Sequence, residues 1–111
     1  MAVGAAALQP FAEEPFQSAL AAGKPVLIQI HADWCPTCRA QAPILDALAT
    51  EAPYAGITRF RVDFDSQAQV VKKLGASAQS TLILFGGGKE LARSVGATAE
   101  PAIRALLDHA R

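Results

Sequence analysis

Two cysteines, Cys35 and Cys38, are the residues of this 111-residue chain whose type and spacing point most directly to chemistry. They follow an apolar run, residues 26–30, and precede a stretch with helical periodicity. Unpaired amides and the helix dipole at a helix N-terminus favour negative charge, so a thiol at Cys35 ionises more readily than a free one. Cys38 lies one turn further on the same face, close enough to form a disulfide or share a metal ion. The spacing therefore permits reversible dithiol–disulfide exchange, in which Cys35 attacks and Cys38 resolves the mixed disulfide.

The composition limits the class of protein. Hydrophobic residues make up 51% of the chain and charged residues 18%, with ten basic against ten acidic side chains. This balance predicts one folded domain over residues 1–111 and offers no field of one sign for nucleic acid or an anionic membrane. Two cysteines are too few for a disulfide framework or for a four-thiolate zinc site within one chain.

The first seven residues are small and apolar apart from the initial methionine. They lack a basic start and are too short to span a bilayer, so no membrane span is expected. Two interpretations remain open: a disordered leader, or the remnant of a trimmed secretory signal.

The elements that must position the cysteines follow from hydrophobic periodicity and from Gly and Pro signals. Pro43 falls inside the helix that starts at the cysteines, and we expect one kinked helix there rather than two helices. Asp65 or Ser66 is the expected cap of the third helix, and Thr98 that of the last. In chain order we expect an edge strand within 8–11, a helix 13–22, a buried parallel strand 26–31, a helix from 35 to about 51, a strand 57–64, a helix 67–74, hairpin strands 81–85 and 90–95 around the turn 86–89, and a helix 99–109.

This order of elements resembles that of the thioredoxin family, and so do five sequence blocks. The blocks are residues 32–38 (ADWCPTC), 42–45 (APIL), 62–65 (VDFD), 80–85 (STLILF) and 95–97 (VGA). The likeness runs from about Leu8 to the C-terminus. It implies an α/β fold of three layers, α/β/α, with a central mixed sheet of four to five strands and four helices.

The resemblance also implies an activity and its partners. A thioredoxin-like chain is a thiol-disulfide oxidoreductase that acts on protein disulfides or dithiols and exchanges electrons with a separate reductase or oxidase. No cofactor is expected beyond the redox-active Cys35–Cys38 disulfide, and a monomer is expected. Among the site-shaping residues, Trp34 forms a wall of the site, Arg61 matches a basic position near it, and Gly96 lies beside the substrate groove. Thr81 follows Ser80 in the matched block and also counts among them.

One position in the buried strand departs from the family pattern. Thioredoxins usually carry an aspartate six residues before the first cysteine, where it is thought to relay the proton of the resolving thiol. Here Gln29 occupies that position and cannot titrate. His31 points to the same face of the strand and has a suitable pKa range, so it is either an alternative proton carrier or a half-buried polar residue at a strand end.

Ser80 stands where the family has a cis-proline that faces the cysteines. A cis bond without proline costs roughly 2.5 to 4 kcal/mol, so we expect a trans Gln79–Ser80 bond and a changed groove. Because the family's proline is thought to keep metal ions off the thiols, a second function is open: a dimer that shares a metal ion or iron-sulfur cluster through two Cys35/Cys38 pairs. A third is a structural or chaperone-like domain with a permanently oxidised pair.

The residues between the cysteines, Pro36 and Thr37, replace the usual Gly-Pro. They tune the stability of the thiolate, so a cytosolic reducing potential cannot be assumed. The Ala-Asp-Trp-Cys block is similar to that of exported reductase domains. It favours the bacterial periplasm, with the cytoplasm as the alternative.

Overall fold

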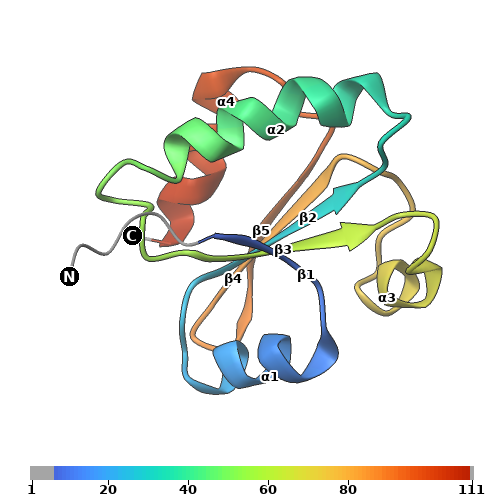
Figure 1. The fold of residues 1–111 in the computed structure, drawn as a ribbon. Coiled ribbons are helices and arrows are strands. Elements are labelled where there is room, and N and C mark those ends of the chain that lie inside the picture. The colour runs from blue at the N-terminus through green and yellow to red at the C-terminus, as the bar shows by residue number, and fades with distance from the viewer. Residues whose placement is uncertain (1–6, 111) are drawn as a thin grey trace.

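The computed structural model describes residues 7–110, and its centre is a five-stranded mixed sheet (Figure 1). The strand order is β1-β3-β2-β4-β5; β1, β3 and β2 run parallel, while β4 is antiparallel to β2 and to β5. The apolar run that precedes the cysteines is therefore the central strand, as its sequence predicted. The strands are β1 (Leu8–Pro10), β2 (Val26–His31), β3 (Thr58–Asp63), β4 (Thr81–Gly86) and β5 (Lys89–Val95).

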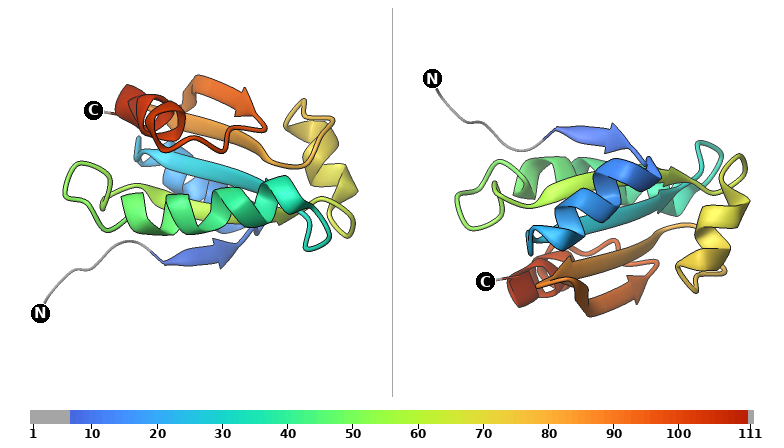
Figure 2. Two further views of the ribbon diagram at one scale, coloured as in Figure 1. Left: turned by 90° about the horizontal axis from the view of Figure 1, so that it is seen from above. Right: turned by 90° about the horizontal axis from the view of Figure 1, so that it is seen from below.

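Four helices cover the two faces of this sheet (Figure 2). Helices α2 and α4 lie on one face and α1 and α3 on the other, so the three-layer α/β/α prediction is confirmed. A short 3-10 turn, Asp108–Ala110, follows the last helix. The helices are α1 (Glu13–Ala21), α2 (Pro36–Leu48), α3 (Ala68–Lys73) and α4 (Glu100–Leu107).

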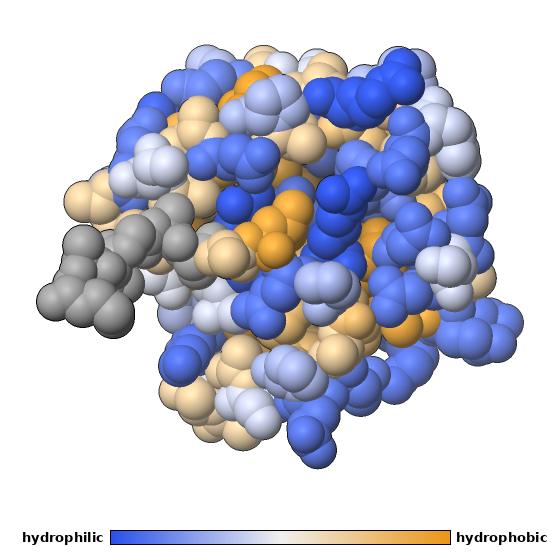
Figure 3. Space-filling view, in the orientation of Figure 1, coloured by the Kyte–Doolittle hydropathy of each residue, from blue (hydrophilic) through white to orange (hydrophobic). Residues whose placement is uncertain are grey.

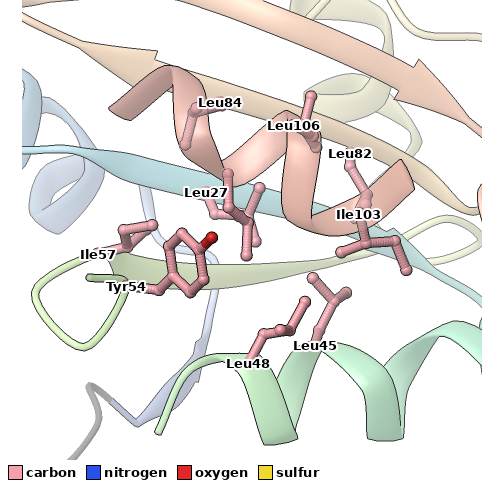
Figure 4. Close-up of a cluster of buried hydrophobic side chains, with 10 residues drawn as sticks. Leu27, Leu45, Leu48, Tyr54, Ile57, Leu82, Leu84, Ile103 and Leu106 are labelled. Atoms are coloured by element: carbon pink, nitrogen blue, oxygen red, sulfur yellow. The ribbon is translucent and has the colours of Figure 1, made fainter. Parts of the chain in front are cut away.

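Each face of the sheet has its own apolar core. On the α2 and α4 side, leucines of β2 and β4 pack against both helices, and Tyr54 and Ile57 close the end of the layer (Figure 4). On the other side, Phe60 meets Phe11 and Phe16 edge to face with ring centroids 6.0 and 6.1 Å apart, and the Phe11 and Phe16 rings lie tilted at 5.1 Å. Outside these cores, hydrophilic side chains cover most of the face shown in Figure 3, with smaller apolar spots between them.

Helix α2 carries the cysteines and holds them against the sheet. Leu45 and Leu48 are fully buried on the predicted stripe, and the helix is continuous through Pro43. The single helix is thus confirmed over the alternative of two helices. It is shorter than predicted, since it ends at Leu48 and a series of turns leads to β3.

Two predicted caps are wrong. Helix α4 begins after Ala99, which offers no side-chain cap, rather than after Thr98. Helix α3 begins after Gln67, also without a side-chain cap. There the Asp63 carboxylate accepts hydrogen bonds from both the amide and the hydroxyl of Ser66, each at 2.7 Å, so Ser66 closes the preceding turn instead of capping the helix.

The hairpin turn is tighter than predicted. Strand β4 continues to Gly86 and β5 starts at Lys89, which leaves only Gly87 and Gly88 in the loop. Both have positive φ, 60° and 83°, as the favoured two-residue hairpin turns require.

None of the helices in the described range has the length and apolar character that crossing a bilayer requires. The predicted leader falls almost entirely on residues 1–6, outside the described residues.

Candidate active site

Cys35 is the N-cap of α2, and both cysteines are unpaired thiols. The backbone of Cys35 is extended, with φ −88° and ψ 112°, while its amide donates to the Ala32 carbonyl at 3.0 Å. Its sulfur accepts a hydrogen bond from the Cys38 amide at 3.2 Å. Pro36 occupies the first helical turn, where its missing amide hydrogen leaves no helix bond unmade.

The environment of Cys35 favours its thiolate. Burial alone favours the neutral thiol, but hydrogen bonds from the thiol and amide of Cys38 and from the Thr37 amide outweigh it. The neighbouring Ser80 hydroxyl acts in the same direction, so the pKa of Cys35 lies below its usual value. The nucleophile that the sequence predicted thus has the electrostatic setting that a nucleophile needs.

Cys38 is the opposite case. Burial raises the pKa of its thiol, and the nearby Cys35 sulfur raises it further. Its sulfur lies 4.0 Å from the Ile30 carbonyl oxygen at the end of β2. One cysteine of the pair is therefore poised to ionise first, as ordered two-step exchange requires.

Trp34 stands beside the cysteines with 56% of its surface exposed. Its indole Nε1 donates to the Asp65 carboxylate at 2.6 Å, and its ring meets Phe64 edge to face at 6.5 Å. Both partners follow β3, so the indole is anchored and still presents an apolar surface.

Ser80 precedes β4 and adopts an unusual backbone conformation. Its peptide bond is trans, as predicted, and its φ is +56°, the one positive value at a non-glycine residue within 7–110. An L-residue in this region costs about 1–2 kcal/mol. Hydrogen bonds hold it: its amide donates to the Ile30 carbonyl at 2.8 Å, and its hydroxyl donates to the Gln79 carbonyl at 2.7 Å.

The comparisons with known proteins agree with this geometry. The thioredoxin family model matches residues 7–109. The chain belongs to the thioredoxin family. It is 39% identical to the thioredoxin of Chlamydia muridarum over 89 residues, 80% of this chain and 84% of that protein. Thioredoxin-1 of Saccharomyces cerevisiae is 38% identical over 74% of this chain and 78% of its own length. The crystal structure of Trxlp from Edwardsiella tarda superposes with a TM-score of 0.88 at 37% identity, over 91% of this chain and 98% of that one.

Gln29 stands where the resemblance implies an aspartate. Gln29 is buried, and its Oε1 accepts two hydrogen bonds from the Arg59 guanidinium, at 2.9 and 3.1 Å. Arg59 also reaches the Asp46 carboxylate of α2 at 2.8 Å. A neutral amide thus faces a buried cation. The sequence did not single out Arg59. The alternation of side chains along the strand places Arg59 and Arg61 on the same face, but it does not show which of the two is buried.

The predicted His31 and Arg61 meet at a surface carboxylate. The His31 Nε2 lies 3.0 Å from Asp33 Oδ1, and the Arg61 Nη2 donates to the same oxygen at 2.9 Å. His31 is 8% exposed, whereas the Asp33 side chain is 88% exposed. Asp33 and Arg61, but not His31, line a cavity of about 480 Å³. The proposed proton-carrier role of His31 stays a prediction.

The far side of the site is formed by β4, β5 and α2. The amide of Gly96, which has φ +76°, donates to the Ser80 carbonyl at 3.0 Å, and the Thr81 hydroxyl donates to the Ala78 carbonyl at 2.7 Å. Gln41, which the sequence analysis left out, is 3% exposed and lies on the stripe 38, 41, 45, 48. The sequence signal that could have identified Gln41 is a polar residue at a position of that stripe that faces the core.

The shared metal centre remains the alternative use of the two thiols. The described residues contain no group of three or more Cys, His, Asp or Glu side chains placed to hold a metal ion. Cys35 and Cys38 supply two thiols, so a four-thiolate centre would need two more from a second copy. The shared centre that Ser80 made conceivable stays a prediction.

Proposed function

We propose that this chain is a thiol-disulfide oxidoreductase that uses Cys35 as nucleophile and Cys38 as resolving thiol on protein disulfides. The observation that carries the proposal is the Cys35 sulfur at the N-cap of α2, with the Cys38 amide donating to it. Membership of the thioredoxin family supports the same activity class.

The reaction balances over two exchanges. The Cys35 thiolate attacks one sulfur of the substrate disulfide, forms a mixed disulfide and releases the other substrate sulfur as a thiolate, which takes a proton. Cys38 then loses its proton and attacks the Cys35 sulfur. The Cys35–Cys38 disulfide forms and the second substrate thiol leaves. Two electrons pass to the substrate, and a dithiol or reductase partner restores the pair.

The second exchange needs an exit for the Cys38 proton. Gln29 cannot accept it, and the Arg59 guanidinium that it binds is a permanent cation. We therefore propose that water entering the groove accepts this proton. Ionisation of the Cys38 thiol, whose pKa burial raises, then limits the resolving step below alkaline pH.

Reduction of insulin disulfides in the presence of dithiothreitol tests the proposal. The wild-type protein should accelerate the appearance of turbidity, and Cys35→Ser should reduce the rate to that of dithiothreitol alone. Equal rates for the two proteins would contradict the proposal. Metal analysis of protein purified without oxygen tests the rival function, which needs a bound metal and a dimer.

A further inference from the structure

We propose that Gln41 is a positioning residue that fixes the two loops next to the cysteine pair, where the resemblance to thioredoxins implies a substrate groove and a rigid proline at position 80. The inference rests on the proposed function, because a groove matters only if a polypeptide binds there. Gln41 lies three residues after Cys38, on the face of α2 that meets the sheet.

The side-chain amide of Gln41 bridges both segments. Its Nε2 donates to the Ala97 carbonyl at 2.9 Å and to the Ser80 carbonyl at 3.4 Å. Ala97 belongs to the turn between β5 and α4, and Ser80 to the loop before β4. One nitrogen atom therefore links the cysteine helix to two loops that are 39 and 56 residues away in sequence.

The same contacts continue to the cysteines. The Ser80 carbonyl also accepts from the Gly96 amide at 3.0 Å, and the Ser80 amide donates to the Ile30 carbonyl. That Ile30 oxygen is the one facing the Cys38 sulfur. Displacing Ser80 would thus disturb the Gly96 turn and the surroundings of Cys38 together.

Position 80 needs such support because serine does not fix its own backbone. A proline ring sets φ covalently, whereas Ser80 sits at +56°, a conformation that persists only when neighbouring groups hold it. A buried glutamine whose two amide hydrogens each meet a loop carbonyl supplies that hold from a rigid helix.

Hydrogen exchange of the wild-type protein is the first test and needs no variant. The side-chain amide protons of Gln41 should exchange at least about tenfold more slowly than those of Gln17, which is exposed and bonds only to Glu13 across one helical turn. Equal exchange rates for the two side chains would overturn the proposal.

Gln41→Met is the second test, since methionine keeps the length of the side chain and removes the donors. The Ser80 and Gly96 amides should exchange roughly tenfold faster, while the Ile28 amide in the central strand changes less. A uniform change at all three amides would mean that Gln41 only packs the core, and would overturn the proposal.

Kinetics of insulin reduction complete the test, with Gln17→Met as the matched control. Gln41→Met should raise KM several-fold and change kcat less than twofold, because the nucleophile is intact and the groove is loosened. If the wild-type protein is active and Gln41→Met has the same KM, the positioning role of Gln41 is overturned and the proposed function is not. An inactive wild-type protein would instead contradict the proposed function, while the exchange results would still decide the role of Gln41.

Discussion

The reactivity of Cys35 depends on a few hydrogen bonds to a single sulfur atom. Most come from the helix that it caps, and the neighbouring Ser80 hydroxyl also lowers the pKa of this thiol. In this structure that hydroxyl donates to the Gln79 carbonyl, and it can turn toward the sulfur once Cys35 ionises.

Ser80→Ala should slow the alkylation of Cys35 by iodoacetamide at pH 7 by about two- to tenfold, the effect of one lost hydrogen bond. The loss of the hydroxyl raises the pKa of Cys35, so less thiolate is present at neutral pH, and the two rates should converge at alkaline pH. Ser77→Ala, at an exposed serine nearby, is the control. A rate for Ser80→Ala equal to that of the control across the pH range would show that the hydroxyl does not act on the thiolate.

Gln29 has a structural role that its position in the family pattern does not reveal. Gln29→Leu removes the acceptor of two Arg59 hydrogen bonds and leaves a buried guanidinium with Asp46. We expect a loss of about 1–3 kcal/mol in the free energy of unfolding, measured with urea. Gln17→Leu should stay within about 0.5 kcal/mol. A loss no larger than that of Gln17→Leu would contradict this account.

At the scale of elements, the periodic segments were predictable and their ends were not. The alternation in β3 and the apolar stripe of α2 are set by side chains that face the cores, and these determine which segments form. Helix ends depend on local competition for hydrogen bonds. Ser66 illustrates this. Its residue type and position predicted a cap for α3, but in the structure its amide donates to the Asp63 carboxylate.

The glycine that ends α3 provides a direct test of backbone conformation. Gly75 has φ +70°, and a Cβ there would meet only an Arg93 nitrogen at 4.0 Å. Gly75→Ala should lower the free energy of unfolding by about 1–2 kcal/mol through the backbone alone.

Gly56→Ala is the matched control, since a Cβ at Gly56 meets nothing within 4 Å and its φ lies outside the positive region. It should be neutral or stabilise by up to about 1 kcal/mol, because it restricts the unfolded chain. If urea unfolding shows equal effects for the two substitutions, the positive φ of Gly75 is not the cause of the loss in stability.

At the scale of the molecule, the architecture and the placement of the cysteine pair were within reach of the sequence, while the contacts between distant segments were not. Gln41 is the example, because its two partners come from loops that only the folded chain brings beside α2. Arg59 is another example. Whether Arg59 or Arg61 is the buried arginine of β3 depends on where α2 crosses the sheet.

Acid should weaken the whole fold through its carboxylates. Hydrogen bonds from Arg104 lower the pKa of Glu51, those from Arg93 lower that of Glu90, and those from Ser66 lower that of Asp63. A carboxyl group with a depressed pKa stabilises the fold above its unfolded value, and this stabilisation disappears as the pH falls through the folded value. The urea midpoint should thus fall between about pH 5 and pH 3; a constant midpoint over that range would contradict it.

The assignment of the two cysteines is tested most directly by trapping the intermediate. Cys38→Ser leaves Cys35 able to attack and removes the thiol that resolves the mixed disulfide. Mixing this variant with oxidised insulin should give a covalent adduct that mass spectrometry locates on Cys35 and that dithiothreitol releases. The Cys35→Ser variant, with only the Cys38 thiol, whose pKa burial raises, should give none. An adduct that forms on Cys38, or none with either variant while the wild-type protein is active, would contradict the account.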